Sequence, residues 1–295
     1  MISGLFNLQE IVSNPKFVVG GLSRFDAKQG QLDDCCLCAS ISTLTLQPDL
    51  LERVVPLDQS FSYGYAGKYL FVEAIANYIF CHIHQICIGY TYTKIFLESV
   101  VVKASPVFSG IFHFRFWHFG EWVDVVIDDR LPTLNGSLIF MRSEQKNEFW
   151  SALLEKAYAK LWGTYEALPN RCVVDIMEDL TGGVTETFYI DYWMKEDLHK
   201  LLFNAHQMGA LINSLIYKSK ADDGKGLIRG HAYSITEFAQ VNYLGANVSL
   251  IRLRNPWGTK HQWSGPFGDT STEWNYVLPN ERKKLLVVAE DGEFW

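Results

Sequence analysis

The run Gln29-Gly-Gln-Leu-Asp-Asp-Cys35 leads into a segment whose apolar residues repeat with helical spacing. These residues are Leu37, Ile41, Leu44, Leu50 and Leu51. The spacing predicts a helix over 35–51 that begins at the cysteine, with Asp33 or Asp34 as its N-cap. A thiol at a helix N-terminus meets the partial positive charge of the helix, which favours the reactive thiolate. Cys35 is therefore a candidate nucleophile for acyl transfer.

Two residues far downstream complete this chemistry. His231 opens the strand-like stretch 231–236, and Asn255 closes the strand-like stretch 248–255. An antiparallel hairpin that turns near 243–246 would bring both residues to the same end of the pair. The Asn255 amide would then orient the imidazole, which activates the thiol and later protonates the leaving amine. The alternative, a core histidine and a turn asparagine before Pro256, is weaker because it leaves this register unexplained.

Two further side chains suit supporting roles at the same site. Gln29 lies just ahead of Cys35, where its side-chain amide could join a backbone N–H in an oxyanion hole. Trp257 follows Asn255 closely and could shield the histidine–asparagine hydrogen bond from water. The sequence therefore favours cysteine-type acyl transfer as the reaction class.

The composition narrows the class of partners. The chain has 295 residues, 48% of them hydrophobic and 14% aromatic, with a net charge of −7. This length allows one large domain or two lobes. The acidic excess is spread along the chain and no basic stripe occurs, which argues against a nucleic-acid partner. Clustered carboxylates could instead bind a hard cation.

The cysteines and the N-terminus indicate the cellular compartment. Cys35, Cys36 and Cys38 lie so close in the chain that they are poor disulfide partners for one another. Residues 1–10 have no positive region and no long apolar run, so no secretory signal is predicted. Polar residues interrupt the apolar stretch 71–88, so a membrane span is not expected. We therefore expect a reducing, cytoplasmic setting.

Hydrophobic periodicity predicts the remaining elements. Strands are expected over 111–128, an amphipathic helix over 148–161, a hinge at Gly182-Gly183, a helix over 195–208 and mainly β-structure after Ala210. The segment 68–110 breaks this order. It is rich in Tyr, Phe, Ile and Val, yet it has neither the turn residues of a loop nor a clean period.

Several longer motifs occur besides the run that ends at Cys35. They are Phe116-Trp-His-Phe-Gly-Glu-Trp-Val-Asp124, Asn147-Glu-Phe-Trp-Ser-Ala-Leu-Leu-Glu-Lys-Ala-Tyr-Ala-Lys160, Gly230-His-Ala-Tyr-Ser234, Arg254-Asn-Pro-Trp-Gly258 and Glu290-Asp-Gly-Glu-Phe-Trp295. Together they resemble the protease core of the calpain family over about 11–67 and 111–295. The resemblance implies an α+β, papain-like fold, with a helical cysteine lobe over 1–182 and an antiparallel, β-rich histidine–asparagine lobe over 183–295. It also implies that the second lobe is cut short and that the family's regulatory modules are absent from this chain.

The resemblance further implies a calcium-dependent endopeptidase with one calcium ion in each lobe. The first site would use the carbonyls of Val19 and Gly21 with the carboxylates of Asp26 and Glu148. The second would use Asp269, Asp291, Glu293 and the Ala289 carbonyl. Gln262 stands where the family has a further glutamate, and the loss of a carboxylate should weaken the second site. Without the resemblance, these acids would be interpreted as ordinary solvated surface.

The chain departs from the family's pattern close to the nucleophile, which puts activity in doubt. Asp33 replaces a glycine, and its bulk and negative charge oppose thiolate formation. Cys36 replaces a tryptophan that packs beside the active site. Pro169-Asn-Arg171 replaces Ser-Gly-Gly and places side chains where the substrate backbone would approach.

The segment 68–110 is an atypical insertion, because in the family Gly67 would join Ile111 directly. Its sharp edges, the intact motifs on both sides and its non-periodic apolar composition suggest a retained intron or a gene-model error. Sequencing of transcripts across the join tests this hypothesis, and the presence of the segment in most messages would refute it.

Two functions from different classes follow from the sequence. The first is a calcium-activated cysteine endopeptidase that makes limited cuts in cytoplasmic proteins. The second is a catalytically silent calpain-like protein that binds partners or substrates without cleaving them. A third outcome is a mis-assembled product in which 68–110 exposes an aggregation-prone surface.

Overall fold

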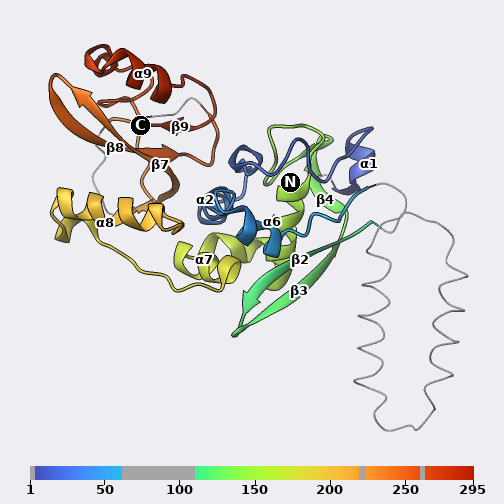
Figure 1. The fold of residues 1–295 in the computed structure, drawn as a ribbon. Helices are drawn as coiled ribbons and strands as arrows, with labels where there is room; N and C mark the ends of the chain where they lie inside the picture. The colour runs from blue at the N-terminus through green and yellow to red at the C-terminus, as the bar shows by residue number, and fades with distance from the viewer. Residues whose placement is uncertain (1–3, 62–109, 219–223, 260–262) are drawn as a thin grey trace, which may run out of the picture.

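The computed structural model describes residues 4–61, 110–218, 224–259 and 263–295 (Figure 1). All but the last residue of the expected insertion 68–110, and Gln262, lie outside the described residues. Helices and antiparallel sheets combine in an α+β arrangement, as the sequence predicts. Within the described ranges, no helix is both long enough and apolar enough to cross a membrane.

The first part of the chain is built around helices and two small sheets. Its helices are α1 (Leu8–Ile11), α2 (Cys35–Leu44), α3 (Pro48–Val54), α6 (Trp150–Leu161) and α7 (Val173–Thr181), with short 3₁₀ turns η1 (Arg24–Asp26) and η2 (Tyr165–Asn170). Its strands are β1 (Gly4–Asn7), β2 (Ile111–His118), β3 (Glu121–Asp128), β4 (Arg130–Leu134) and β5 (Ser137–Leu138). Strands β2 and β3 form an antiparallel hairpin, and β1 pairs with β4, which pairs with β5.

The second part of the chain is built around one antiparallel sheet in the order β6-β7-β8-β9. Its strands are β6 (Asn213–Ile216), β7 (His231–Tyr243), β8 (Ala246–Arg254) and β9 (Glu293–Phe294). Helices α8 (Lys195–Gln207) and α9 (Pro279–Leu285) and the 3₁₀ turns η3 (Ile190–Tyr192) and η4 (Thr272–Tyr276) accompany this sheet. The sequence predicts the hairpin and α8 but not α9, which begins with a proline at its first turn.

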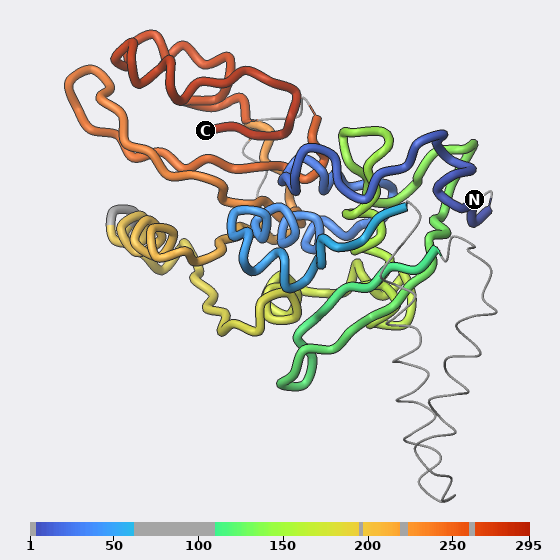
Figure 2. Tube along the Cα trace, turned by 45° about the vertical axis from the view of Figure 1, so that its right-hand side comes forward, coloured from blue at the N-terminus to red at the C-terminus, as the bar shows by residue number. Residues whose placement is uncertain are grey.

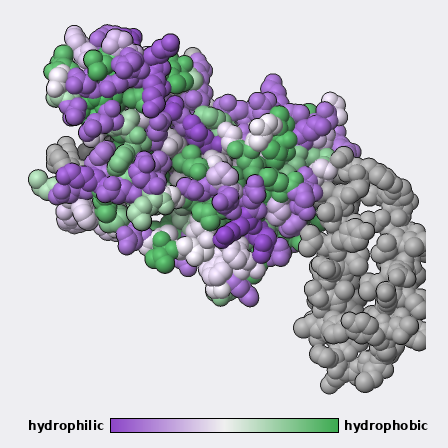
Figure 3. All heavy atoms as spheres, viewed as in Figure 1, coloured by the Kyte–Doolittle hydropathy of each residue, from purple (hydrophilic) through white to green (hydrophobic). Residues whose placement is uncertain are grey.

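The buried apolar side chains form two large clusters. One gathers residues from Leu8 to Leu180, including the fully buried Phe114 and Trp150 on β2 and α6. The other gathers residues from Val241 to Trp295 around Trp274. In Figure 2 the C-terminal segments, orange to red, likewise gather on one side of the molecule, and the blue-to-green segments on the other. On the face drawn in Figure 3, hydrophilic residues alternate with small apolar patches over both parts.

The predicted helix over 35–51 is wrong in one respect. The structure has two helices there, α2 and α3, separated by residues 45–47. Pro48 occupies the first turn of α3, and a proline has no N–H to continue a helix that arrives from the N-terminal side. The apolar spacing carries on across this break because both helices bury their leucines in the same core.

Polar contacts join the two parts along helix α2. The Ser234 hydroxyl on β7 donates to the Ala39 carbonyl at 2.9 Å, and the Thr43 hydroxyl lies 2.6 Å from Asn213 Oδ1 on β6. The Gln29 N–H donates to the Pro256 carbonyl at 2.9 Å. The helix that carries Cys35 therefore packs directly against β6 and β7, and β7 carries His231.

Candidate active site

Cys35 is the first residue of α2 and is 4% exposed. It packs with Ala39, one turn along the helix, and with Ala232 on β7 in a small cluster between the two large cores. Cys36 and Val173 contact the same cluster from its edge. The predicted nucleophile thus lies where helix α2 of one part meets the sheet of the other.

The surroundings of Cys35 favour its thiolate. Its pKa falls from 9.0 to about 4, chiefly because the Cys36 thiol donates a hydrogen bond to it. Burial opposes this change, and the hydrogen bond and charge of His231, with the backbone N–H of Ala232, act in the same direction as Cys36. The pKa of Cys36 is raised in return, because the same hydrogen bond and burial keep its proton in place. At neutral pH the pair therefore holds one thiolate and one thiol.

The predicted histidine–asparagine pair forms. His231 Nε2 lies 2.9 Å from Asn255 Oδ1, and both side chains are buried. The backbone N–H of Trp257 donates to the same oxygen at 3.0 Å, which fixes the orientation of the amide. Because Oδ1 can only accept, Nε2 carries the proton and Nδ1 is left free to exchange one. The Trp257 ring lies over the imidazole with 4.8 Å between the centroids, so it covers this pair.

The β7–β8 hairpin places these two residues together. Its turn is Leu244-Gly245, between the paired Tyr243 and Ala246, as the sequence predicts. The register then shifts by one residue between Ile235 and Glu237, which is a β-bulge close to the active end. A bulge changes the direction of neighbouring side chains, and His231 lies four residues before Ile235 on the same strand.

Gln29 is held next to Asn255 by a backbone hydrogen bond to Pro256. Its side-chain Nε2 donates to the Leu32 carbonyl at 2.8 Å. The side chain is 7% exposed, and its Oε1 has no hydrogen-bond partner among the described residues. One amide hydrogen remains for a substrate oxygen, so its oxyanion role stays a prediction that this placement allows.

The residues that depart from the family pattern differ in their exposure to solvent and in their contacts. The Asp33 side chain is exposed, whereas Asp34, the N-cap of α2, is buried. Pro169 and Asn170 are exposed on η2. The Arg171 guanidinium stacks on Trp162 at 3.5 Å and pairs with Asp179 at 3.6 Å, so it is held by its own neighbours.

Comparison with known proteins agrees with this geometry. A family model described as calpain family cysteine protease matches residues 7–78 and 80–295. The chain belongs to the calpain family. It is 46% identical over 291 residues to the calpain-1 catalytic subunit of Rattus norvegicus, which covers 97% of this chain and 34% of that protein. Calpain-9 of Homo sapiens is 44% identical over 292 residues, covering 97% of this chain and 36% of that protein. The chain thus spans about a third of the length of these relatives.

The acids of the first calcium site expected from the calpain family lie close together. Asp26 and Glu148 are both buried, and the Ser143 hydroxyl lies 2.6 Å from Glu148 Oε2 and 3.4 Å from Asp26 Oδ1. Burial, with the negative charge of Asp26, raises the pKa of Glu148 to about 7. Val19 meets Glu148 through its N–H rather than its carbonyl, and Gly21 has a left-handed φ of +107° in the same loop.

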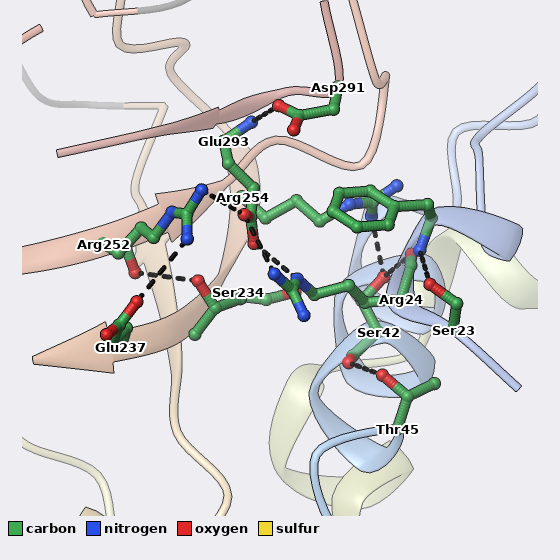
Figure 4. Close-up of polar contacts among 12 residues, drawn as sticks. Ser23, Arg24, Ser42, Thr45, Ser234, Glu237, Arg252, Arg254, Asp291 and Glu293 are labelled. Atoms are coloured by element: carbon green, nitrogen blue, oxygen red, sulfur yellow. Dashed lines mark hydrogen bonds and ion pairs between the residues drawn. The ribbon is translucent and has the colours of Figure 1, made fainter. Parts of the chain in front are cut away.

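The acids of the second calpain site are partly engaged by cations. Burial, followed by the charge of Asp291, raises the pKa of Asp269 to about 6. The Glu293 carboxylate accepts from Arg24 at 2.5 Å and from Arg252 at 2.8 Å, as Figure 4 shows. Asp291 Oδ1 accepts from the Glu293 N–H at 2.8 Å, and Ala289 lies on the same loop. Across the described ranges, no three His, Cys, Asp or Glu side chains are grouped so as to hold a metal ion.

Sequence reasoning missed the buried polar residues that support the site. Arg254 is 1% exposed and reaches from β8 to the Ser42 hydroxyl on α2 at 2.8 Å (Figure 4). Burial lowers its pKa to about 10. Glu155 lies on the buried face of α6 behind Asp34. The sequence offers one indication for each residue. Arg254 directly precedes Asn255, and Glu155 interrupts the apolar face of a predicted helix.

Proposed function

We propose that this chain is the protease core of a calcium-dependent cysteine endopeptidase that makes limited cuts in cytoplasmic proteins. The observation that carries the proposal is the 2.9 Å His231–Asn255 pair, with the buried Cys35 at the start of α2 packed against Ala232, the neighbour of His231. The lowered pKa of Cys35 agrees with this arrangement. Family membership supports the reaction class. Protein substrates follow from that class, because a peptide carbonyl is what such a thiolate attacks.

The first half of the reaction forms an acyl-enzyme. The Cys35 thiolate attacks the scissile carbonyl carbon, and the carbonyl electrons move onto oxygen. The Gln29 amide and a backbone N–H stabilise that oxyanion. When it collapses, the C–N bond breaks, and protonated His231 delivers the proton from Nδ1 to the leaving amine. Asn255 keeps the ring in the orientation that this transfer needs.

The second half returns the enzyme to its starting state. Neutral His231 accepts a proton from water at Nδ1 while the water oxygen attacks the thioester carbon. The tetrahedral intermediate collapses with loss of the Cys35 thiolate, and the product acid departs. Asn255 again stabilises the imidazolium through Nε2–H, and the Trp257 ring excludes water from that hydrogen bond.

We further propose that calcium binds at both acidic sites. Asp26 and Glu148 suit a hard cation, because the two carboxylates crowd each other without a positively charged partner among the contacts they make. Asp269, Asp291 and Glu293 fit less well, since Glu293 is already paired with two arginines. Calcium would supply positive charge that neutralises these acids and fixes their loops. The two hydrophobic cores support a division into lobes over 1–182 and 183–295.

A thiol-directed protease inhibitor tests the proposal. We expect an epoxysuccinyl peptide to label Cys35 at saturating calcium, and the Cys35→Ser variant to remain unlabelled. If Cys35 of the folded protein fails to react at saturating calcium, the protease proposal is wrong and the silent calpain-like binding protein takes its place. Far-UV circular dichroism of both proteins supplies the folding control.

A further inference from the structure

Two acids are buried side by side behind the nucleophile, and the mechanism above uses neither of them. Asp34 directly precedes Cys35, and Glu155 lies in the middle of α6; each is 1% exposed. Asp34 Oδ1 accepts a weak hydrogen bond from the Cys38 thiol at 3.7 Å. Its other oxygen, Oδ2, is buried without a hydrogen-bond partner among the described residues. A buried carboxylate oxygen left in this state is costly, so it points to a missing donor.

Glu155 can be that donor only as a neutral acid. Its two oxygens lie 3.2 Å and 3.1 Å from the Met141 N–H, and two ionised carboxylates would repel each other. Burial and the charge of Asp34 raise the pKa of Glu155 well above its ordinary value. Burial also raises the pKa of Asp34 to about 7, although the hydrogen bond with Glu155 lowers it. Glu155 therefore keeps its proton at neutral pH and can donate it to Asp34.

The Met141 contact extends this link to the oxyanion loop. Residues 139–142 run alongside 28–31: Lys28 and Arg142 exchange backbone hydrogen bonds of 3.0 Å, and the Gln31 N–H donates to the Ile139 carbonyl at 2.7 Å. Gly30 lies between them, where an added Cβ would come within 2.2 Å of the Phe140 carbonyl oxygen. Glu155 thus touches the segment that holds Gln29 on one side and the residue before Cys35 on the other.

We propose that Glu155 is a positioning residue for the protease reaction proposed above. As a neutral acid it donates a hydrogen bond to the Asp34 carboxylate, accepts one from Met141, and so fixes Cys35 relative to Gln29 and His231. The other titratable groups near the pair are the thiols of Cys35, Cys36 and Cys38 and the Tyr165 hydroxyl, which is buried without a hydrogen-bond partner in the described part of the chain. Of these groups and the pair itself, the side chain that accepts from the Met141 N–H is Glu155.

Two substitutions of Glu155 test this role. Glu155→Gln keeps a donor for Asp34 and an acceptor for Met141, whereas Glu155→Leu keeps neither. Ser151→Ala is the matched control, because this buried hydroxyl lies one turn earlier on α6 and has no hydrogen-bond partner among the described residues. The readouts are the pH midpoint of Cys35 alkylation by iodoacetamide, followed by mass spectrometry, and kcat and KM for peptide cleavage.

We expect Glu155→Leu to raise the alkylation midpoint, because Cys35 loses the part of its thiolate stabilisation that comes from His231. We also expect kcat to fall by about 10-fold or more with little change in KM, and Glu155→Gln to restore both. If both variants behave alike, or if the midpoint falls in Glu155→Leu, the positioning role is wrong; a fall would show that Glu155 acts through the charge of Asp34.

Two checks keep these outcomes separable. If Glu155→Leu does not fold, as judged by circular dichroism, Asp34→Ala removes the acceptor of the same hydrogen bond and carries the same expectation. Alkylation requires no peptide cleavage. A wild-type chain that alkylates at low pH but never cleaves peptide would therefore refute the protease proposal, while the alkylation midpoints of the variants would still decide the role of Glu155.

Discussion

The Cys36 thiol is the largest single influence on the charge of the nucleophile. It donates to the Cys35 thiolate from the position where the resemblance to calpains implies a tryptophan. A hydrogen bond to a charged group contributes about 1.5–3 kcal/mol, which corresponds to roughly 1–2 pH units. A cysteine that raises doubt in the sequence thus supports thiolate formation in the structure.

Replacement of Cys36 should therefore weaken the nucleophile. We expect Cys36→Ala to move the alkylation midpoint of Cys35 upward from about 4 by roughly 1–2 units, because the thiolate loses a donor. The exposed Cys172 gives the control, since Cys172→Ser removes a thiol outside this hydrogen bond. The rate of Cys35 alkylation, measured in quenched samples at a series of pH values, gives the midpoint of the pH dependence. An unchanged or lower midpoint in Cys36→Ala would show that the Cys36 hydrogen bond is not made in solution.

Loss of the hydrogen bond between Asn255 and His231 should lower kcat. In Asn255→Ala the imidazole loses its 2.9 Å contact at Nε2, so the ring can rotate and change tautomer. A lost hydrogen bond to a charged group predicts a fall in kcat of about 10- to 100-fold. Steady-state cleavage of a fluorogenic peptide measures it. Asn255→Asp is the matched variant, because its side chain can still accept the hydrogen bond from His231 Nε2. If kcat falls equally in Asn255→Ala and Asn255→Asp, the hydrogen bond accepted by Oδ1 is not what supports turnover.

At the scale of elements, the β7–β8 turn is the feature that aligns the active end of the sheet. Both central residues have left-handed backbones, with φ of +51° at Leu244 and +84° at Gly245. Such a turn matches the twist of a two-residue hairpin, and glycine adopts it without strain. Leu244 adopts it at a cost.

Substitutions at the two turn residues should differ in their effect on the free energy of unfolding. We expect Gly245→Ala to lower the free energy of unfolding by about 1 kcal/mol, because open space surrounds the glycine and only the backbone is strained. Leu244→Gly should cause no comparable loss, since it relieves the same strain. Urea unfolding followed by tryptophan fluorescence compares them. Equal destabilisation by both changes would contradict a strained two-residue turn.

The sequence predicts elements well where periodicity and turn chemistry act locally. The strands β2 and β3, the β7–β8 hairpin, α6 and α8 follow from alternation, glycine turns and apolar spacing. The break before Pro48 was missed because leucines on both helices enter one core and keep the spacing. Cys35, His231 and Asn255 could be predicted from chemistry and register. Glu155 and Arg254 could not, because their partners come from distant segments and only the packed structure shows that they are buried.

At the scale of the whole molecule, the calcium proposal makes a prediction about pH. A carboxylate must lose its proton before it binds a metal. Because the pKa of Glu148 is raised to about 7, protons compete with calcium below that pH and the apparent affinity falls as pH decreases. We expect the calcium concentration for half-maximal binding to rise several-fold from pH 8 to pH 6, measured by isothermal titration calorimetry.

A paired substitution shows whether Glu148 causes this effect. Glu148→Gln cannot take up or release a proton, so its calcium affinity should be weaker at every pH and should vary less between pH 6 and pH 8. Glu144→Gln is the matched control, because Glu144 is a more exposed acid close by that forms a 3.6 Å ion pair with Lys28. A wild-type affinity that does not change with pH would contradict calcium binding at the Asp26–Glu148 pair.

The most direct test of the account is a calcium titration of peptide cleavage, with the full chain, a variant that lacks 68–110, and Cys35→Ser as control. We expect no cleavage in a calcium chelator, a rise to saturation as calcium is added, and no cleavage by Cys35→Ser at any calcium concentration. Cleavage that persists in the chelator, or in Cys35→Ser, would contradict a calcium-gated cysteine endopeptidase. The same conclusion would follow if neither the full chain nor the variant that lacks 68–110 cleaves peptide at saturating calcium while both are folded.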